Sequence, residues 1–440
     1  MIVRSIEQTA MRKVYLRLLP FAIITYFFCY LDRINVGFAS LTMNKDLGLS
    51  ATAFGTAAGC FFWGYALFEV PSNIVLEKVG ARIWIARIMI TWGLLSGATA
   101  FCTGPYSFMT VRFLLGVAEA GFFPGIVLFF TYWFPDRHRA RIVSGFTMAL
   151  PIAVALGAPM STGLMELNGL WGLAGWKWMY LAEAVPTVLL GVGVFFYVTD
   201  KPAKASWLSE AERGWLLETL AAERRAVEAQ HAIGAWRALI DPKVLLLSLN
   251  YFGIVIASLG MLIFLPQIIK QLGLTNMQVG WASMIPYLCG AVSMVACGWL
   301  SDRLGERRWS LFFTCVLSVI GLVIAGLGVG TVWAVVGMSI AAAGFYGTKG
   351  PFWAMPSMLL TGTAAATGIA WINSIGNLGG FFGPSIVGWV RDQTGSFAGG
   401  LYTLAAFALI SAVVSLFWLN FQSPVAVSVA KRDRVGVAAE

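Results

Sequence analysis

The chain has 440 residues, of which 58% are hydrophobic and only 12% carry a charge. Charged residues make up about 25% of an ordinary soluble domain, so this composition and a mean hydropathy of +0.77 exclude a soluble globular protein and favour one that lies in lipid. The formal net charge of +9 gives no reason to expect a nucleic-acid partner, because its distribution follows the membrane topology derived below.

Apolar runs of about 20 residues, the length of helix that crosses a hydrocarbon core of about 30 Å, recur along nearly the whole chain. We identify twelve of them, at 15–39, 54–76, 84–103, 106–133, 142–165, 176–198, 243–268, 278–300, 309–328, 332–360, 366–390 and 400–420. The sequence therefore predicts an all-α polytopic membrane protein with 12 transmembrane helices. The first run is too long for a signal-peptide core and contains Asp32 and Arg33, so we expect it to be a helix rather than a cleavable signal.

The longest polar stretch, at 199–242, divides the predicted helices into two groups of six. We expect an N-terminal bundle at 1–198, a cytoplasmic linker at 199–242, a C-terminal bundle at 243–422 and a cytoplasmic tail at 423–440. Within the linker, Ser209 and Glu212 have the spacing of a capping box at the start of a helix.

Lys and Arg are distributed unequally between the two sets of connections that join the predicted spans. One set holds 23 of the 30, the other holds only Lys45, Lys177, Lys270 and Arg391, and the remaining three are Arg33, Arg112 and Lys349 inside spans. Positive charge accumulates in cytoplasmic loops, so we expect both termini in the cytoplasm of a bacterial-type inner membrane. Anionic membrane lipid is the partner that the basic surface would meet.

An acid-base-x-Gly-x-Arg pattern occurs twice, after the second predicted helix and after the eighth, at a separation of 225 residues. Its two copies are Glu77-Lys78-x-Gly80-x-Arg82 and Asp302-Arg303-x-Gly305-x-Arg307. The same separation relates Pro159 to Pro384 and Gly163 to Gly388. This repetition indicates two related halves, as in transporters built from similar bundles around a central site.

The second copy, with Gly298 four residues before Asp302, resembles the loop motif of the major facilitator superfamily. The first copy departs from that motif, since Asn73 replaces the leading glycine and Glu77 the aspartate. Within the superfamily, four stretches resemble the anion:cation symporter family, most closely its tartrate, phthalate and 4-hydroxyphenylacetate permeases: 30–37, 69–73, 112–125 and 368–380. The resemblance implies the MFS fold, in which two pseudo-symmetric six-helix bundles enclose a substrate site.

Arg112 and Glu119 are seven residues apart in one predicted helix, and so lie on one face about 10.5 Å apart along its axis. At that distance they cannot neutralise each other, and ionised groups at membrane depth are expensive to keep. A substrate carboxylate on Arg112 and a proton on Glu119 would satisfy both. The alternative is that each forms a fixed bridge to another helix, for instance Arg112 to Asp32.

Asp32 and Arg33 are adjacent, so they point about 100° apart around their helix and are not expected to pair with each other. The family resemblance implies that Arg33 contacts the substrate anion while Asp32 and Glu119 take up and release protons. It also implies that Arg112 helps to hold the anion or an acid. Arginine suits such a site because its planar guanidinium donates two parallel hydrogen bonds to a carboxylate.

Further polar residues within apolar spans are candidate substrate contacts: Asn250, Tyr251 and Gln267 in the seventh span, Lys349 in the tenth, and Asn373 and Asn377 in the eleventh. Hydrogen bonding between helices is the alternative for the amides and Tyr251, and a snorkelling or interhelical charge is the alternative for Lys349. Glu69 and Glu183 are expected to be structural or gating acids, with their roles open.

The six charged residues of the two repeated motifs are expected to form cytoplasmic charge networks that hold the outward-facing state: Glu77, Lys78, Arg82, Asp302, Arg303 and Arg307. A solvated loop could carry the same charges without a function. Their repetition in both halves favours a gate.

The sequence therefore predicts a secondary transporter that imports a small organic anion by proton symport, with alternating access between its bundles. An efflux antiporter for hydrophobic compounds and a membrane sensor without flux are the alternatives, and Na⁺ is not excluded as the coupling ion. No phosphate-binding loop or metal-ligand cluster is recognisable, and all six cysteines fall in predicted spans, so we predict no enzyme activity, cofactor, metal or disulfide. We expect a monomer to be the functional unit.

Overall fold

A computed structural model describes residues 5–229, 239–305, 307–359 and 362–419, and this part of the chain is helical without any strand. The helices of the N-terminal half are α1 (Ile6–Asp46), α2 (Ala51–Val79), α3 (Ala81–Ala98), α4 (Pro105–Glu119), α5 (Phe122–Thr131), α6 (Asp136–Thr147), α7 (Ala149–Met165) and α8 (Gly175–Tyr197). Those that follow are α9 (Glu210–Ala229), α11 (Pro242–Lys270), α12 (Asn276–Leu304), α13 (Arg308–Leu327), α14 (Val332–Gly347), α15 (Lys349–Leu359), α16 (Gly362–Thr394) and α17 (Ala398–Trp418). Three short 3-10 turns complete the set: η1 (Thr99–Phe101), η2 (Leu170–Gly172) and η3 (Pro202–Lys204).

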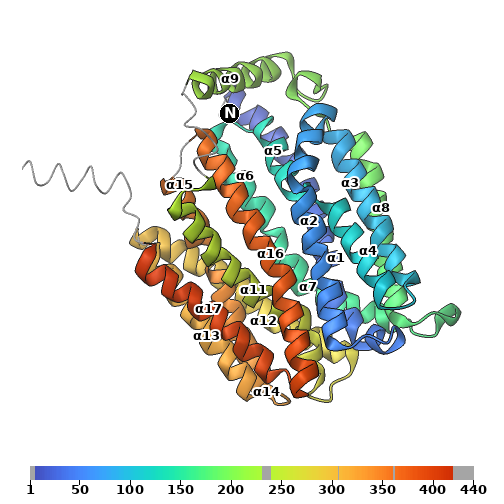
Figure 1. The fold of residues 1–440 in the computed structure, drawn as a ribbon. Coiled ribbons are helices and arrows are strands. Elements are labelled where there is room, and N and C mark those ends of the chain that lie inside the picture. Colours follow the sequence, from blue (N-terminus) through green and yellow to red (C-terminus); the bar gives the residue numbers. More distant parts are fainter. Residues whose placement is uncertain (1–4, 230–238, 306, 360–361, 420–440) are drawn as a thin grey trace, which may run out of the picture.

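Each of the twelve predicted spans coincides with one long helix or with two consecutive helices. Ten such segments of the described chain are long and apolar enough to cross a membrane. The other two spans correspond to α14 with α15 and to α16, which run alongside the rest of the bundle in Figure 1. The paired helices, such as α4 with α5, result from local breaks inside one span.

The two halves repeat the same helix boundaries. Both α2 and α12 have 29 residues, and α12 begins and ends 225 residues after α2. Each is followed by a glycine with positive φ, Gly80 at 99° and Gly305 at 64°, a conformation that costs glycine little. The predicted repeat is therefore present in the structure as well as in the charge motif.

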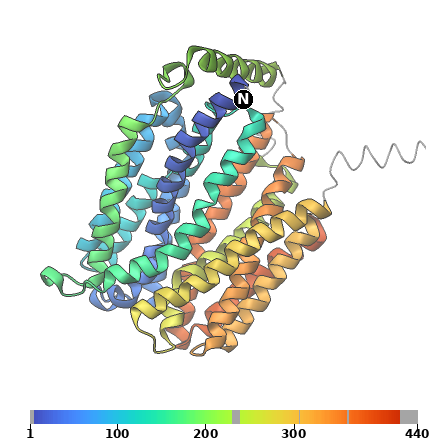
Figure 2. The same ribbon diagram turned by 180° about the vertical axis from the view of Figure 1, so that it is seen from behind.

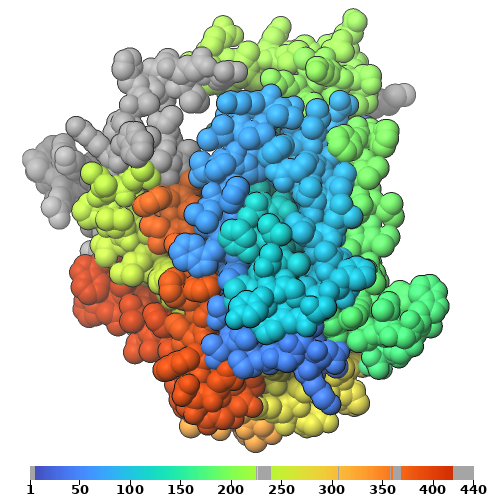
Figure 3. Space-filling view, turned by 45° about the vertical axis from the view of Figure 1, so that its right-hand side comes forward, coloured from blue at the N-terminus to red at the C-terminus, as the bar shows by residue number. Residues whose placement is uncertain are grey.

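Two long seams join the halves, one between α2 and α16 and the other between α7 and α12 (Figures 1 and 2). Small residues allow this approach: a Cβ at Gly55 would lie 2.2 Å from the carbonyl oxygen of Pro384, and one at Gly280 would lie 2.0 Å from Thr162 Oγ1. Figure 3 shows α2 beside α16 along one face. Since the repeat relates α2 to α12 and α7 to α16, it exchanges the two seams.

Polar contacts hold the halves together at the end opposite α9. The carboxylate of Asp392 on α16 accepts hydrogen bonds from the backbone N–H groups of Ala51 (3.1 Å) and Thr52 (2.8 Å), which begin α2. Gln267 on α11 donates to Ser40 Oγ on α1 at 2.9 Å. One half therefore caps a helix of the other, and we call this the closed end of the molecule.

The linker helix α9 lies across the other end of the N-terminal half, as Figures 1 and 3 show. The predicted capping box is confirmed, because Ser209 N–H donates to Glu212 Oε2 at 2.9 Å and Glu212 N–H donates to Ser209 Oγ at 3.3 Å. Lys13 Nζ on α1 contacts Glu212 Oε2 at 2.7 Å, which fixes α9 to the bundle. We call this the α9 end; the predicted tail at 423–440 and linker residues 230–238 lie outside the described residues.

Replacing Gly55 by alanine should destabilise the protein. The new Cβ would meet the Pro384 backbone, which cannot swing aside as a side chain can, so α2 and α16 must separate. We expect a loss of about 1–3 kcal/mol in the free energy of unfolding, measured by thermal or denaturant unfolding in detergent. The matched control is Gly193→Ala on α8, where the Cβ meets open space and stability should be unchanged or slightly raised. Equal stability of the two variants would contradict this account of the seam.

Candidate functional site

The centre of the N-terminal half contains an ion pair between α1 and α4. Arg33 Nε and Nη2 both lie 2.5 Å from Glu119 Oε1, and Cys29 Sγ donates to the same oxygen at 3.2 Å. The Glu119 side chain is fully buried, whereas 21% of the Arg33 side chain is exposed. Three aromatic rings surround the Arg33 guanidinium at 5.0–5.5 Å from Cζ: Tyr30, Phe61 and Tyr65. The pair combines a partly accessible cation with an inaccessible acid.

A break in the helix places Glu119 at its position. Glu119 is the last residue of α4, Ala120 leaves the helical region with ψ at 132°, and Gly121 has φ at 85° before α5 begins. Gly121 also lies against α2, where a Cβ would be 2.4 Å from Ser72 Oγ. Discontinuous helices of this kind expose backbone ends at the binding sites of membrane transporters.

Asp32 points away from Arg33 into the core of the N-terminal half, as the 100° spacing predicts. Its carboxylate accepts hydrogen bonds from Trp92 Nε1 (2.6 Å), Ser96 Oγ (2.7 Å) and Asn35 Nδ2 (3.3 Å). The residue is only 2% exposed. Thr187 Oγ1 on α8 also donates to it at 3.5 Å, so Asp32 is held by neutral donors from α1, α3 and α8.

Glu183 on α8 is a second acid of this core. The Asn35 amide that donates to Asp32 also donates to Glu183 Oε2 at 2.9 Å, and Ser161 Oγ donates to Glu183 Oε1 at 2.7 Å. Glu183 is fully buried. Asn35 thus links two buried carboxyl groups, and in this arrangement Glu183 contacts only the N-terminal half.

Arg112 lies on α4 with its side chain almost fully buried at 2% exposure. Its guanidinium carbon is 5.2 Å from the centre of the Phe61 ring, and its Nε and Nη1 atoms have no hydrogen-bond partner among the described residues. The expected alternative of a direct Arg112–Asp32 bridge is not found there, since Asp32 bonds to the donors named above. Arg112 therefore retains donors that an anion could use.

The C-terminal half contributes an aromatic and cationic cluster. The Tyr251 ring on α11 stacks on Phe352 of α15 with centroids 4.9 Å apart, and Lys349 Nζ lies 5.5 Å from the Tyr251 centroid. Both Arg33 and Glu69 of the other half interact electrostatically with Tyr251. The cluster consequently faces the Arg33 region across the interface between the halves.

On α16, Asn373 contacts an acid of the other half. Its Nδ2 donates to Glu69 Oε1 at 3.1 Å, and the neighbouring Ser374 Oγ lies 3.4 Å from Glu69 Oε2. Asn377, one turn later, is half-buried. These contacts cross the α2–α16 seam, so the Glu69 carboxylate belongs to the same interface as the Arg33 site.

Asn250 and Gln267 form contacts between helices. Asn250 Nδ2 donates to the carbonyl oxygen of Ser411 (2.7 Å) and to Ser415 Oγ (2.9 Å), both on α17. Gln267 bonds to Ser40 near the closed end. In this arrangement their amide donors follow the helix-to-helix alternative.

The repeated charge motifs lie at the α9 end, one in each half. Arg307 Nη2 is 2.5 Å from Asp302 Oδ1, and Arg303 lies over the Trp299 ring with Cζ 5.2 Å from its centre. In the first copy the backbone N–H of Arg82 donates to Asp200 Oδ1 at 2.8 Å, while the side chains of Glu77 and Lys78 are exposed. None of these contacts joins one motif to the opposite half in the described part of the chain.

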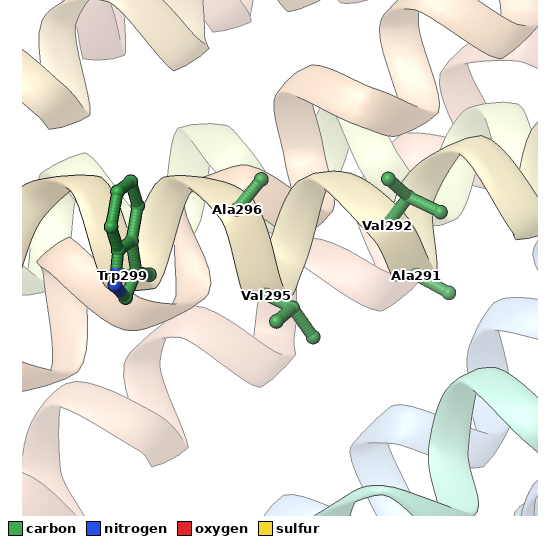
Figure 4. Close-up of a pocket in the computed structure, with 5 residues that line it drawn as sticks. All are labelled: Ala291, Val292, Val295, Ala296 and Trp299. Atoms are coloured by element: carbon green, nitrogen blue, oxygen red, sulfur yellow. The ribbon is translucent and has the colours of Figure 1, made fainter.

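A groove along α12 differs in character from the site above. It is lined by Ala291, Val292, Val295, Ala296 and Trp299, all apolar (Figure 4). Val292, Val295 and Trp299 are each more than half exposed. Such a surface suits lipid acyl chains and carries no cation for an anion.

Comparison with known proteins identifies the family. Residues 22–384 match the family model of the major facilitator superfamily. The chain belongs to this superfamily. It is therefore a multi-pass integral membrane protein and a transporter of small molecules rather than an enzyme, and the predicted MFS fold is confirmed.

Relatives with different names match most of the chain. A protein of Agrobacterium vitis named "Putative tartrate transporter" is 52% identical over 94% of this chain and 95% of its own length. A protein of Acinetobacter baumannii named "Quinolone resistance transporter" is 39% identical over 93% of this chain and 94% of its own length. In the fold, an inward-facing bacterial homologue of the human lysosomal transporter Spinster matches with a TM-score of 0.77 at 15% identity, covering 92% of this chain and 96% of that one.

Several residues of this transporter's central region were not singled out by the sequence. Trp92, Ser96 and Ser161 bind the buried acids, but no charge beside them in the sequence marks them as partners of an acid. Asn35 was detectable, since it follows Asp32 by three residues and so faces the same side of α1. Ser374, next to Asn373, had no signal beyond its place in the family-like stretch.

The Arg33–Glu119 pair should be visible in stability measurements. Arg33→Gln leaves a buried carboxylate without its cation, and we expect a loss of about 3–5 kcal/mol near neutral pH. The double variant Arg33→Gln with Glu119→Gln should recover most of this loss, because it removes both charges. Denaturant unfolding of the four forms in detergent measures the coupling. Lys45→Gln, an exposed charge at the closed end, is the control, and additive losses from the two single variants would refute a direct pair.

Proposed function

We propose that this transporter imports a small organic anion, with tartrate-like dicarboxylates as the leading class, in symport with protons. The proposal rests on one observation: the partly exposed cation Arg33 forms an ion pair with the buried acid Glu119. An arriving carboxylate must compete with Glu119 for the same guanidinium.

That competition would couple the proton to the anion. While Glu119 is ionised it occupies Arg33, and an anion gains little by approaching. Once Glu119 accepts a proton, Arg33 is left without its counter-ion and can form a bidentate contact with a substrate carboxylate. The two events therefore favour each other, and by linkage the anion raises the affinity for the proton by the same factor.

A second positive group supports a dicarboxylate. Lys349 lies over Tyr251 in the C-terminal half, and Arg33 lies in the N-terminal half. A ligand with two carboxylates would contact one cation of each half, which would draw the halves together around it. The relative named for tartrate, a dicarboxylate, is consistent with this arrangement.

The charge distribution supports an orientation. Lys45, Lys177, Lys270 and Arg391 lie at the ends of helices that meet at the closed end, and the Lys/Arg-rich connections lie at the α9 end. By the positive-inside rule the α9 end and both termini are cytoplasmic, in the inner membrane of a bacterium. The contacts at the closed end then describe a state shut to the outside.

Alternating access would break these contacts as the cytoplasmic motifs Glu77–Arg82 and Asp302–Arg307 approach the opposite half. One chain supplies every residue that this cycle needs, so a monomer would suffice.

Efflux of hydrophobic compounds is the second candidate. The named quinolone resistance transporter favours it, and the stretch from Gly157 to Gly163 in α7 partly resembles an antiporter signature. Two arginines and a lysine at the centre are better suited to an anionic substrate.

Uptake into proteoliposomes tests the proposal. An inward proton gradient should drive accumulation of labelled tartrate, and Arg33→Ala should abolish it because the anion loses its main contact. Glu119→Gln should retain binding or exchange but lose the gradient dependence. Glu166→Gln, an exposed acid near the closed end, is the control. If tartrate, phthalate, 4-hydroxyphenylacetate and galactonate all fail to accumulate while a quinolone leaves the vesicles against its gradient, efflux is the function.

Lys349→Met should distinguish substrates by charge. Loss of one charge-assisted contact of about 1.5–3 kcal/mol should raise the KM for tartrate about tenfold or more. Galactonate, with one carboxylate, should compete for the site equally well in the variant and the intact protein. The comparison is made against Lys45→Met. An equal loss of affinity for tartrate and galactonate would mean that Lys349 does not bind the second carboxylate of tartrate.

A further inference from the structure

The acid that joins the halves, Glu69, has no role in the coupling described above. It lies two-thirds of the way along α2, it is 7% exposed, and its two oxygens accept from Asn373 and Ser374 of the opposite half at 3.1 and 3.4 Å. These hydrogen-bond donors are neutral. A buried carboxylate held in this way keeps its charge only at considerable cost unless a cation or a proton compensates it.

Among the described residues, the charged and titratable groups that act on Glu69 come from three helices. Arg33 on α1 acts on it electrostatically, as do Tyr65 on α2 and Tyr251 on α11, while α16 presents the neutral donors Asn373 and Ser374. Arg33 is the one cation of this set, and it is already bonded to Glu119. Glu69 therefore depends on a positive charge that the substrate is proposed to take.

Local structure holds Glu69 next to this site. Asn73 Nδ2 donates to the Glu69 carbonyl oxygen at 2.8 Å across the turn that contains Pro71, which has no N–H of its own. Ser72 in the same turn lies against Gly121, two residues after Glu119. Tyr65, one turn earlier, lies with its ring 5.0 Å from the Arg33 guanidinium. The turn of α2 that carries Glu69 thus packs against the break in the helix that carries Glu119.

We propose that Glu69 is a further proton-binding residue of the transport cycle, beside the expected Asp32 and Glu119, which takes up a proton when an anion binds Arg33 and so adds one proton per anion to the coupling. The inference rests on the proposed anion symport. An anion on Arg33 cancels the positive charge that favours ionised Glu69 and adds a negative charge nearby, so both changes favour protonation. The proton stays on Glu69 until the anion leaves.

The contact with α16 links this proton to movement. Ionised Glu69 accepts two hydrogen bonds from Asn373 and Ser374, whereas the protonated form has one fewer strong acceptor for them. Protonation therefore weakens this contact between α2 and α16 and leaves the Asn373 amide for substrate oxygens. With two protons a tartrate dianion crosses without net charge, and with one it carries a negative charge inward.

The experiment measures the proton-to-tartrate ratio in proteoliposomes, from labelled uptake and an internal pH dye, together with the effect of membrane potential. We expect Glu69→Gln to move about one proton fewer per tartrate than the intact protein, and the response of its uptake to the membrane potential should change by the corresponding charge. Asn373→Ala and Ser374→Ala retain the acid and should change the KM while keeping the proton-to-tartrate ratio of the intact protein. An unchanged ratio in Glu69→Gln would overturn the proposal.

A second measurement tests the proposal even if a variant does not transport. Infrared titration of the purified protein in detergent reports buried protonated carboxyl groups without any substrate. A protonated-carboxyl band that titrates in the intact protein and in Glu166→Gln should be reduced in Glu69→Gln, and an identical titration in all three would refute the inference. If the intact protein moves no protons with tartrate, the proposed symport fails, while this titration still decides whether Glu69 binds a proton.

Discussion

The cost of keeping ionised groups inside a membrane protein governs the arrangement of the central region. Arg33 and Glu119 meet the cost by direct pairing, with two of the three guanidinium nitrogens on a single carboxylate oxygen. Pairing requires α1 to lie against the end of α4, and the break at Ala120 and Gly121 turns the chain there. The pair therefore links α1 to the end of α4 through side chains, and it occupies the guanidinium that a ligand would need.

The other buried acids are held in a different way. Asp32 and Glu183 bond to indole, hydroxyl and amide donors, and they share the Asn35 amide. These bonds lie within the N-terminal half and do not change when the halves move as rigid bodies. Glu69 accepts the same types of donor, but from the opposite half. This difference is the physical reason to connect Glu69, and not Glu183, with movement between the halves.

Movement between the halves would take place at the two seams where their helices lie in close contact. Glycines bring α2 against α16 and α7 against α12, and the 225-residue repeat exchanges these pairs. Bonds at the closed end, from Asp392 to the start of α2 and from Gln267 to Ser40, are few and exposed or half-buried. They can be exchanged for other contacts at modest cost, as the proposed alternating access requires.

The sequence by itself determined the helical class, the number of spans, the repeat and the family, because each depends on local composition or on motifs that are contiguous in the chain. It also showed that Asp32 and Arg33 point in different directions, since helical spacing alone decides that. Only the tertiary structure decided that Arg33 pairs with Glu119, that Asn250 bonds to α17, and that Glu69 contacts α16. These partners lie 86, 161 and 304 residues apart in the chain, and no periodicity relates such distances to a contact. Which buried group meets which is set by how the helices pack, and that is a property of the assembled bundles.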